Sequence, residues 1–409
     1  MDRNLRWLAF GAVVRAAGLS LLGPFVALYL RNVLHVGYAQ LGVLVALLGI
    51  VPLALYPFGG QIADRLGRRR LFLASLVVEA ASILGIALAM HARSLGGVLG
   101  TSVGTGIAGA LGGPALSAYV ADLASGSDRT TGFTWFRIGW NVGFTVGALA
   151  GGVLIGFLGF ATDGLLAGAV LVGSTALLTL VLEPSPYDRD RAAGRPRPAA
   201  EGRQEASPWR VLGADRLFLG FCATAAIAGL ATNQWGTTFP VYANTVLGLP
   251  YAYVGIGLAL NGLLVVFAQA PTTHAAIGHR HTRLLLLGIA LYVAGFLLFG
   301  LVALLPALVL GGFLASVLVL TMGENVLSIP TSTLPSNLAP PGEIGAYNGA
   351  FFAISGIGGV LATTVGGFVL ALGLSPPLTW AILMLPAFPA LALVYAWLGR
   401  RIPAGPDRA

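Results

Sequence analysis

Four ionisable side chains interrupt long apolar stretches of the chain: Arg15, Glu79, Arg137 and Glu324. An ionisable group inside an apolar segment long enough to cross a membrane is costly, so it is a candidate for function. Counted from the expected segment ends, all four lie roughly 8–12 Å inside the same boundary, at about 1.5 Å per helical residue. The role they suggest at that depth is proton coupling, in which the acids bind and release the proton and the arginines influence them by charge. Ion pairs, with arginines that reach toward water, are the open alternative for Arg15, Arg137 and Glu79.

Glu324 differs from the other three because no basic residue is near it in the sequence. A carboxylic acid removed from water favours its neutral form, so this group is expected to take up and release a proton. A hydrogen bond between packed helices is the alternative role. We expect Glu324 about six residues from the end of its apolar segment, and Asp163 in a solvated turn between two segments.

A second group of polar and aromatic side chains suits the binding of an organic molecule. Gln234, Thr238 and Tyr242 recur every four residues and therefore share one face of a helix. A cavity with aromatic walls and few hydrogen-bonding groups suits amphipathic molecules. Hydrogen bonds between helices and aromatic residues at the membrane interface are the alternative explanation. The candidates for substrate binding are Gln234, Trp235, Thr238, Tyr242, Asn261, Trp140, Asn141 and Asn325.

The elements that must position these residues are membrane-spanning helices. Apolar residues make up 56% of the 409 residues and charged residues only 9%, against about 25% charged residues in a soluble domain. So few charges cannot cover a soluble surface, and disordered chains are poor in apolar residues. A helix needs about 20 apolar residues to cross a bilayer. Twelve such runs are predicted, at 7–30, 38–58, 71–91, 95–121, 132–157, 160–182, 215–246, 252–272, 283–302, 306–330, 343–372 and 376–398.

The positions of the arginines predict the orientation of these spans. All 23 basic residues are arginines. With twelve spans, 19 of them fall on the side that holds both termini, and two, Arg31 and Arg93, fall on the other. Because positive residues accumulate on the cytoplasmic side, both termini are predicted in the cytoplasm. The same distribution explains the net charge of +8 without a nucleic-acid partner, and the expected location is the cell inner (plasma) membrane.

A polar segment divides the chain into two related parts. Residues 183–214 are rich in Pro, Arg and Ala, which is typical of a linker. A shift of 213 positions places Gly42 on Gly255 and aligns the expected helix boundaries of the two parts. Parallel repeats of this kind hold a substrate between them near the middle of the membrane. The predicted organisation is a six-helix bundle over 1–182, a linker over 183–214, a second six-helix bundle over 215–398 and a tail over 399–409.

The turn after the second expected span carries the most specific motif. Residues 59–70 read GGQIADRLGRRR, which resembles the G-x-L-A-D-R-x-G-R-R signature of the major facilitator superfamily at the position where that family carries it. Glycine permits a tight turn, and the Asp64 carboxylate can accept hydrogen bonds from a helix N-terminus. A basic turn alone does not explain the acid and glycines at this spacing. The resemblance implies conformational gating by Gly60, Asp64, Arg65, Gly67, Arg68 and Arg69 and, around the next turn, by Asp122 and Arg129.

The fifth expected span resembles a motif of the drug:proton antiporters in that superfamily. Its glycines match at Gly143, Gly147, Gly151 and Gly152, whereas Ala148 stands in place of a proline. Glycines every four residues also let two helices approach closely, so a packing role is equally open.

Other family features are partly kept. Gly323-Glu324 followed by Pro330 resembles the tenth span of bacterial multidrug exporters. The arginine that the family carries at the start of the fourth span is replaced by Gly100, and the second-half copy of the turn motif, in 274–283, lacks its aspartate. Three histidines lie in that copy, but no acid or cysteine is near enough in the sequence to complete a metal site.

The resemblance covers essentially the whole chain and implies an all-α membrane protein with twelve transmembrane helices in two six-helix bundles. It implies a monomer that exports small amphipathic molecules in exchange for protons, with Glu324 lining a central cavity. Uptake, or diffusion of a specific metabolite without protons, is the alternative, and Gly100 and Ala148 favour it. A membrane enzyme is not expected, because no nucleophile is paired with a base. A sensor that only retains the fold is not expected either, because the gating motif is intact. No cofactor is expected, and no phosphate-binding loop for ATP is present.

Overall fold

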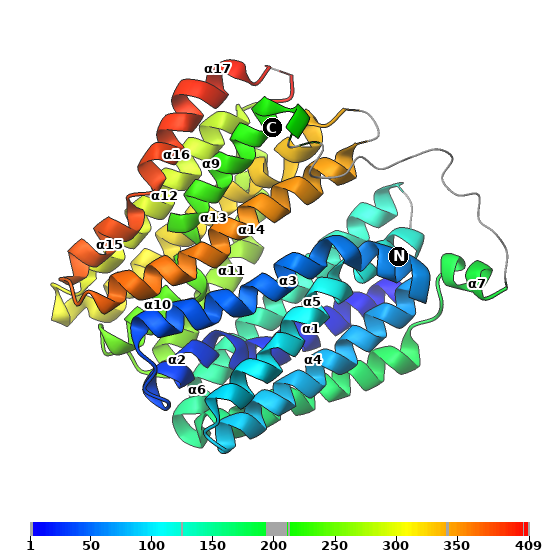
Figure 1. Ribbon diagram of the computed structural model, residues 1–409, viewed down its shortest axis with the longest axis horizontal. Coiled ribbons are helices and arrows are strands. Elements are labelled where there is room, and N and C mark those ends of the chain that lie inside the picture. Colours follow the sequence, from blue (N-terminus) through cyan, green and yellow to red (C-terminus); the bar gives the residue numbers. More distant parts are fainter. Residues whose placement is uncertain are drawn as a thin grey trace. The chain divides into compact units, whose positions relative to one another are not determined.

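The computed structural model describes residues 3–123, 126–193, 211, 213–340, 343–403 and 405–407. The regular elements over these residues are helices (Figure 1). In the first part of the chain they are α1 (Arg3–Leu22), η1 (Gly23–Phe25), α2 (Val26–Asn32), α3 (Tyr38–Leu66), α4 (Arg68–His91), α5 (Leu95–Leu123), α6 (Gly126–Val181) and α7 (Pro186–Ala192). In the second part they are α9 (Arg216–Thr232), η2 (Asn233–Gly236), α10 (Thr238–Thr245), α11 (Tyr251–Ala276), α12 (His281–Val302), η3 (Pro306–Leu308), α13 (Val309–Leu338), α14 (Ile344–Ala371), α15 (Pro376–Met384), α16 (Ala387–Leu393), η4 (Val394–Leu398) and α17 (Gly399–Arg401).

The described residues contain eleven helical segments that are long and apolar enough to cross a membrane. One of them, Thr134–Val181, covers two of the predicted spans, 132–157 and 160–182. Between these two lies Gly159, whose backbone leaves the helical region with φ 78° and ψ 165°. A positive φ of this kind favours glycine, so the change of direction between the two helices occurs at this residue. The all-helical, multi-span architecture predicted from the apolar runs is therefore present.

The chain forms two compact units. The first comprises Met1–Val36, Leu47–Glu201 and Pro250–Leu263, and the second comprises Gly37–Ala46, Gly202–Leu249 and Leu264–Ala409. The start of α3 thus belongs to the second unit and the start of α11 to the first.

The first unit is held together by a close approach of α1 and α6. A Cβ atom added at Gly143, Gly147 or Gly151 would lie within 2.2 Å of a carbonyl oxygen of α1, namely that of Val13, Ala17 or Leu21. The three glycines therefore form a strip along which the two backbones touch. Membrane helices gain much of their stability from such close packing.

We expect Gly147→Ala to destabilise the first unit, because its methyl group would have to push the α1 backbone away at Ala17. The loss should be about 1–3 kcal/mol, the usual cost of overpacking, and a lower thermal unfolding midpoint in detergent measures it. The control is Gly156→Ala on the same helix, where an added Cβ meets nothing within 4 Å. Equal unfolding midpoints for the two variants would contradict the packing role.

The second unit packs α9 against α14 and α12 against α13. Its final span is broken: α15, α16 and α17 follow one another (red in Figure 1), with Pro386 at the first break and a π-helical turn, η4, before α17. Four of its aromatic side chains, Phe239, Tyr242, Phe299 and Trp380, contact one another with ring centroids 4.3–5.3 Å apart. This dense cluster fixes α10 against the segments that follow α11.

In each unit, a carboxylate from a later segment caps the N-terminus of one helix, α4 in the first unit and α12 in the second. In the first unit, Asp188 of α7 accepts hydrogen bonds from the backbone N–H groups of Arg68 and Arg69, at 2.9 and 3.2 Å. In the second, Asp407 accepts from the N–H and hydroxyl groups of Thr282, both at 2.9 Å. A carboxylate is favourable at a helix N-terminus because it satisfies free N–H groups and faces the positive end of the helix dipole. Asp407 of the C-terminal tail thus has the capping role in the second unit that Asp188 has in the first.

Candidate functional site

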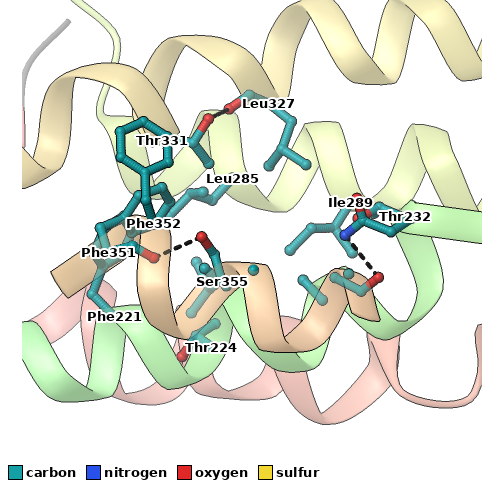
Figure 2. A pocket seen from close by; sticks show the side chains of 17 residues that line it. Phe221, Thr224, Thr232, Leu285, Ile289, Leu327, Thr331, Phe351, Phe352 and Ser355 are labelled. Carbon is teal, nitrogen blue, oxygen red and sulfur yellow. Dashed lines mark hydrogen bonds between the residues drawn. The ribbon is translucent and has the colours of Figure 1, made fainter. Parts of the chain in front are cut away.

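A pocket of about 300 Å³ opens within the second unit (Figure 2). Its walls come from α9, η2, α12, α13, α14 and η4. Phe221 of α9 and Phe351 of α14 stack on one another, with ring centroids 5.2 Å apart and planes 12° from parallel, and form an aromatic wall. The remaining aromatic and polar lining residues are Phe352, Thr224, Thr232, Asn233, Thr331 and Ser355.

The pocket has no charged side chain among its lining residues. Glycines keep it open: Gly229 and Gly359 both line it, and an added Cβ at Gly359 would make only ordinary contact with Asn233, at 3.7 Å. An uncharged cavity with aromatic walls and a few polar groups suits an amphipathic organic molecule.

Glu324 lies at the midpoint of α13, and not near the end of its helix as the sequence indicated. The helix continues through Pro330 and Pro335 to Leu338. Membrane helices tolerate proline because neighbouring hydroxyl groups satisfy the freed carbonyl groups. Glu324 is therefore roughly 20 Å from either helix end, at about 1.5 Å per residue.

The spacing along α13 connects Glu324 with the pocket. Leu327 and Thr331 line the pocket and follow Glu324 by three and seven residues, so the three share one face of the helix. The Ser328 hydroxyl donates to Oε1 of Gln269 on α11, at 3.3 Å. Asn325 beside Glu324 is fully buried, and neither its amide nitrogen nor its amide oxygen has a hydrogen-bond partner. The middle of α13 thus concentrates polar groups in an apolar surrounding.

Arg15 and Glu79 form an ion pair inside the first unit. The guanidinium group donates to both carboxylate oxygens, at 2.5 and 2.7 Å, and the two side chains are 11% and 5% exposed. The guanidinium carbon also lies 5.4 Å from the centre of the Trp140 ring. This geometry is what the alternative interpretation, a buried ion pair, predicts for these residues. Arg137 is exposed on α6, where its carbonyl oxygen accepts from the Asn141 side chain at 2.9 Å.

We expect Glu79→Gln to lower the thermal unfolding midpoint while leaving the pH dependence of transport intact. Removing one partner of a buried ion pair leaves the other charge uncompensated, which costs about 3–5 kcal/mol. The double variant Arg15→Met/Glu79→Leu should recover much of the loss. A transport assay in which Glu79→Gln abolishes pH dependence would instead assign proton coupling to this pair.

The predicted polar face of the seventh span lies inside the second unit. Gln234 is fully buried, and its amide donates to the Leu230 and Ala362 carbonyls, at 2.7 and 3.1 Å. Its amide oxygen accepts from the Thr238 hydroxyl at 2.6 Å. These bonds join α9 and α10 to α14, as helix-joining residues do.

Three further candidates for substrate binding have other surroundings. Trp235 stacks on Phe239 with centroids 4.3 Å apart, and Tyr242 lies in the aromatic cluster. Asn261 is buried on α11 in the first unit. The sequence missed Thr224, Thr331 and Ser355 of the pocket because threonine and serine are common in membrane helices and carry no distinctive spacing.

The turn between α3 and α4 is the centre of a polar cluster in the first unit. Arg68 donates to Oδ1 of Asp64 at 3.0–3.1 Å, to the Ala118 carbonyl at 3.3 Å, and to Asp122 through a short contact. The Asp122 carboxylate is 6% exposed and also accepts from the Ser185 hydroxyl at 2.9 Å, whereas Asp64 is 53% exposed. The buried partner of the motif arginine is therefore Asp122.

Gly67 makes this turn possible with a φ of 97°, and an added Cβ would press against Asp188 at 3.1 Å. Arg69 donates to the carbonyls of Leu182 and Thr179, at 2.9 and 3.1 Å, and so holds the end of α6. Gly60 has open space around its Cα, and Arg65 is exposed. The side chain of Arg129 lies outside the described residues.

The helix α7 belongs to this cluster, although the sequence indicated only a polar linker there. Ser185 and Asp188 form a capping box at its start, with Pro186 at the first position. The Tyr187 hydroxyl donates to the Asp64 carbonyl at 3.1 Å, and the Arg68 guanidinium lies 4.1 Å from the Tyr187 ring centre. The sequence does contain an indication of this helix: the order Ser-Pro-x-Asp over residues 185–188 is typical of a helix start. Most of the predicted linker, 194–210, lies outside the described residues.

Asp163 is not in a solvated turn as the sequence indicated. It is fully buried, and neither carboxylate oxygen has a hydrogen-bond partner. Its place, four residues after Gly159, is at the start of the second helix of the α6 pair, which packs against α4. An added Cβ at the adjacent Gly164 would lie 2.8 Å from Ala87 of α4. The tight contact between these helices explains the exclusion of water.

The helical fold, with eleven described segments long and apolar enough to cross a membrane, is that of a multi-pass membrane protein. The sequence model of the Major Facilitator Superfamily matches residues 8–363. The chain therefore belongs to the Major Facilitator Superfamily, and its motifs resemble those of drug antiporters in that family. The family match indicates a transporter rather than an enzyme.

Sequence relatives include both uncharacterised and drug-resistance proteins. An uncharacterized MFS-type transporter of Mycobacterium tuberculosis is 27% identical over 296 residues, 68% of this chain and 64% of the relative. Multidrug resistance protein 2 of Bacillus subtilis is 30% identical over 34% of each chain. The class C tetracycline resistance protein of Escherichia coli is 33% identical over 34% of this chain and 35% of the relative. The alignments thus span less than two thirds of these relatives.

Solved structures share the fold at low sequence identity. A mutant form of the nucleoside transporter NupG superposes with a TM-score of 0.79 at 14% identity, over 96% of this chain and 99% of the other. A POT family transporter in complex with 5-aminolevulinic acid superposes with a TM-score of 0.76 at 14% identity, over 98% and 97% of the two chains.

Proposed function

We propose that the protein exports small amphipathic organic molecules in exchange for protons, by alternating access of two six-helix bundles. In this proposal twelve helices cross the plasma membrane of the cell, both termini are cytoplasmic, and a monomer is sufficient. The observation that carries it is the position of Glu324, at the midpoint of α13 and on the face that carries two pocket residues. An acid in that place can bind a proton and can also respond to a substrate bound in the pocket.

The coupling follows from competition within one small volume. A protonated Glu324 is neutral and is compatible with an apolar surrounding, whereas a bound substrate in the pocket excludes water and changes the environment of the acid. Proton and substrate then favour different states of the transporter, and each can drive the movement of the other. The cluster around Arg68 stabilises one of these states in the first unit.

The test is transport by purified protein reconstituted in liposomes. An imposed proton gradient should drive movement of ethidium, an aromatic cation with two amino groups, and of neutral aromatic dyes from the same panel. Gly359→Ala, which narrows the pocket without a steric clash, should weaken this movement. If no dye moves although the protein remains folded, export of this class is wrong, and a thermal-shift screen of metabolites follows.

Uptake or facilitated diffusion of one metabolite on the same fold is the second candidate. Gly100 and Ala148 favour it, because each replaces a residue of the antiporter motifs. Movement of a substrate down its own gradient, unchanged by pH, would establish facilitated diffusion in place of proton exchange.

A further inference from the structure

Three hydroxyl groups and one amide group of the pocket donate a hydrogen bond to a backbone carbonyl group. The Ser355 hydroxyl donates to the Phe351 carbonyl at 2.6 Å, and the Thr331 hydroxyl donates to the Leu327 carbonyl at 2.8 Å (Figure 2). The Thr224 hydroxyl donates to the Gly220 carbonyl at 2.7 Å, and Nδ2 of Asn233 donates to the Gly229 carbonyl at 3.0 Å. Each bond runs to the carbonyl group four residues earlier in the chain, and the Asn233 amide uses one of its two hydrogens in this way.

These bonds determine what the pocket offers to a ligand. A serine or threonine hydroxyl has one hydrogen and two lone pairs. When its hydrogen is held by a carbonyl of its own helix, the lone pairs remain and the group acts as an acceptor. The amide oxygen of Asn233 is likewise an acceptor. Among the described polar lining residues, the donors left are the Thr232 hydroxyl, for which no such bond is present, and the second amide hydrogen of Asn233, so acceptors outnumber donors in the pocket.

The rest of the pocket is aromatic and uncharged. The stacked pair Phe221 and Phe351 provides a flat wall, against which an aromatic ring packs favourably. A ligand that brings only acceptor groups would face oxygen lone pairs and would lose its bonds to water without replacement, which is unfavourable.

We propose that this pocket selects aromatic molecules that carry hydrogen-bond donors, such as phenolic hydroxyls, aromatic amines and ring N–H groups. The inference rests on the proposed function in taking the pocket as the substrate site. It adds that substrates are distinguished by their donors, and that aromatic ethers and N-methylated analogues of the same shape bind less well.

A matched pair of probes tests this selectivity. 2-Naphthol and 2-methoxynaphthalene share the ring system, but only the first carries a donor, and it is uncharged at neutral pH. Binding of each to the full chain in lipid nanodiscs is measured by ligand fluorescence, with empty nanodiscs subtracted. We expect 2-naphthol to bind about three- to tenfold more tightly, the range of one or more net hydrogen bonds. Equal affinities, or tighter binding of the ether, would overturn the proposal.

Variants locate the effect. Thr331→Val/Ser355→Ala removes two acceptors at nearly constant shape and should reduce the preference to about twofold or less, whereas Ser316→Ala, a buried back-bonded serine elsewhere on α13, should leave it unchanged. Gly359→Ala should weaken both probes together. Gly358→Ala changes the neighbouring glycine, which does not line the pocket and packs against α9: its added Cβ would lie 2.3 Å from the Ala226 carbonyl. A preference that survives loss of both acceptors contradicts the assignment.

The proposed function can fail separately. Preferential binding of 2-naphthol together with no proton-driven dye movement would support this inference and refute proton-coupled export. Dye movement without any preference between the two probes would support export and refute the inference.

Discussion

Replacing Glu324 with glutamine should remove the pH dependence of transport and lower gradient-driven export roughly tenfold or more, the effect of losing a coupling free energy of ordinary size. Glutamine preserves shape and hydrogen bonding but cannot take up or release a proton. Substrate binding should lose its pH dependence as well, because the proton and the substrate no longer influence each other through this residue. Initial rates in proteoliposomes over a range of pH values give the profile.

The control for this prediction is Glu343→Gln, the same chemical change at the residue that precedes α14. Its pH profile should match that of the natural chain. If Glu324→Gln keeps a normal profile, the proton is carried elsewhere, and Glu79 becomes the first alternative.

Asp122→Asn should slow transport about tenfold or more, whereas Asp64→Asn should slow it only a few-fold. Both acids pair with Arg68, but the Asp122 carboxylate is nearly buried and holds a second hydrogen bond from Ser185. Hydrogen bonds to a buried charge are worth about 1.5–3 kcal/mol, and an exposed ion pair is worth about 0–1 kcal/mol. Transport rates in proteoliposomes should therefore separate the two variants.

Substrate affinity should be nearly unchanged in both variants, because the cluster around Arg68 belongs to the first unit and the pocket to the second. Equal rates for the two variants would mean that burial does not determine the strength of the contact. Loss of substrate binding would contradict a role limited to the conformational change.

The membrane helices could be predicted because apolar runs of the required length are a direct consequence of the bilayer thickness. The α3–α4 turn could be predicted because Gly67 and the residues around it are constrained by the backbone and by charge. Neither inference needs knowledge of which helices are neighbours.

The position of Glu324 at the middle of its helix could not be predicted, because Pro330 and Pro335 normally end a helix and here lie inside one. Nor could the pocket, which is built from helices far apart in the sequence. Gln234 and Thr238 have the spacing expected of a binding face, but their bonds to each other and to α14 are only visible once the helices are packed.

The most direct test of exchange between substrate and protons is the movement of protons caused by the substrate itself. Proteoliposomes with a pH-sensitive dye inside, and with the membrane voltage clamped by potassium and valinomycin, receive ethidium outside without any imposed proton gradient. Exchange predicts that the interior becomes more alkaline as substrate enters, and that Glu324→Gln abolishes the change. Acidification of the interior would show cotransport, and entry of substrate with no change of internal pH would show that protons are not coupled at all.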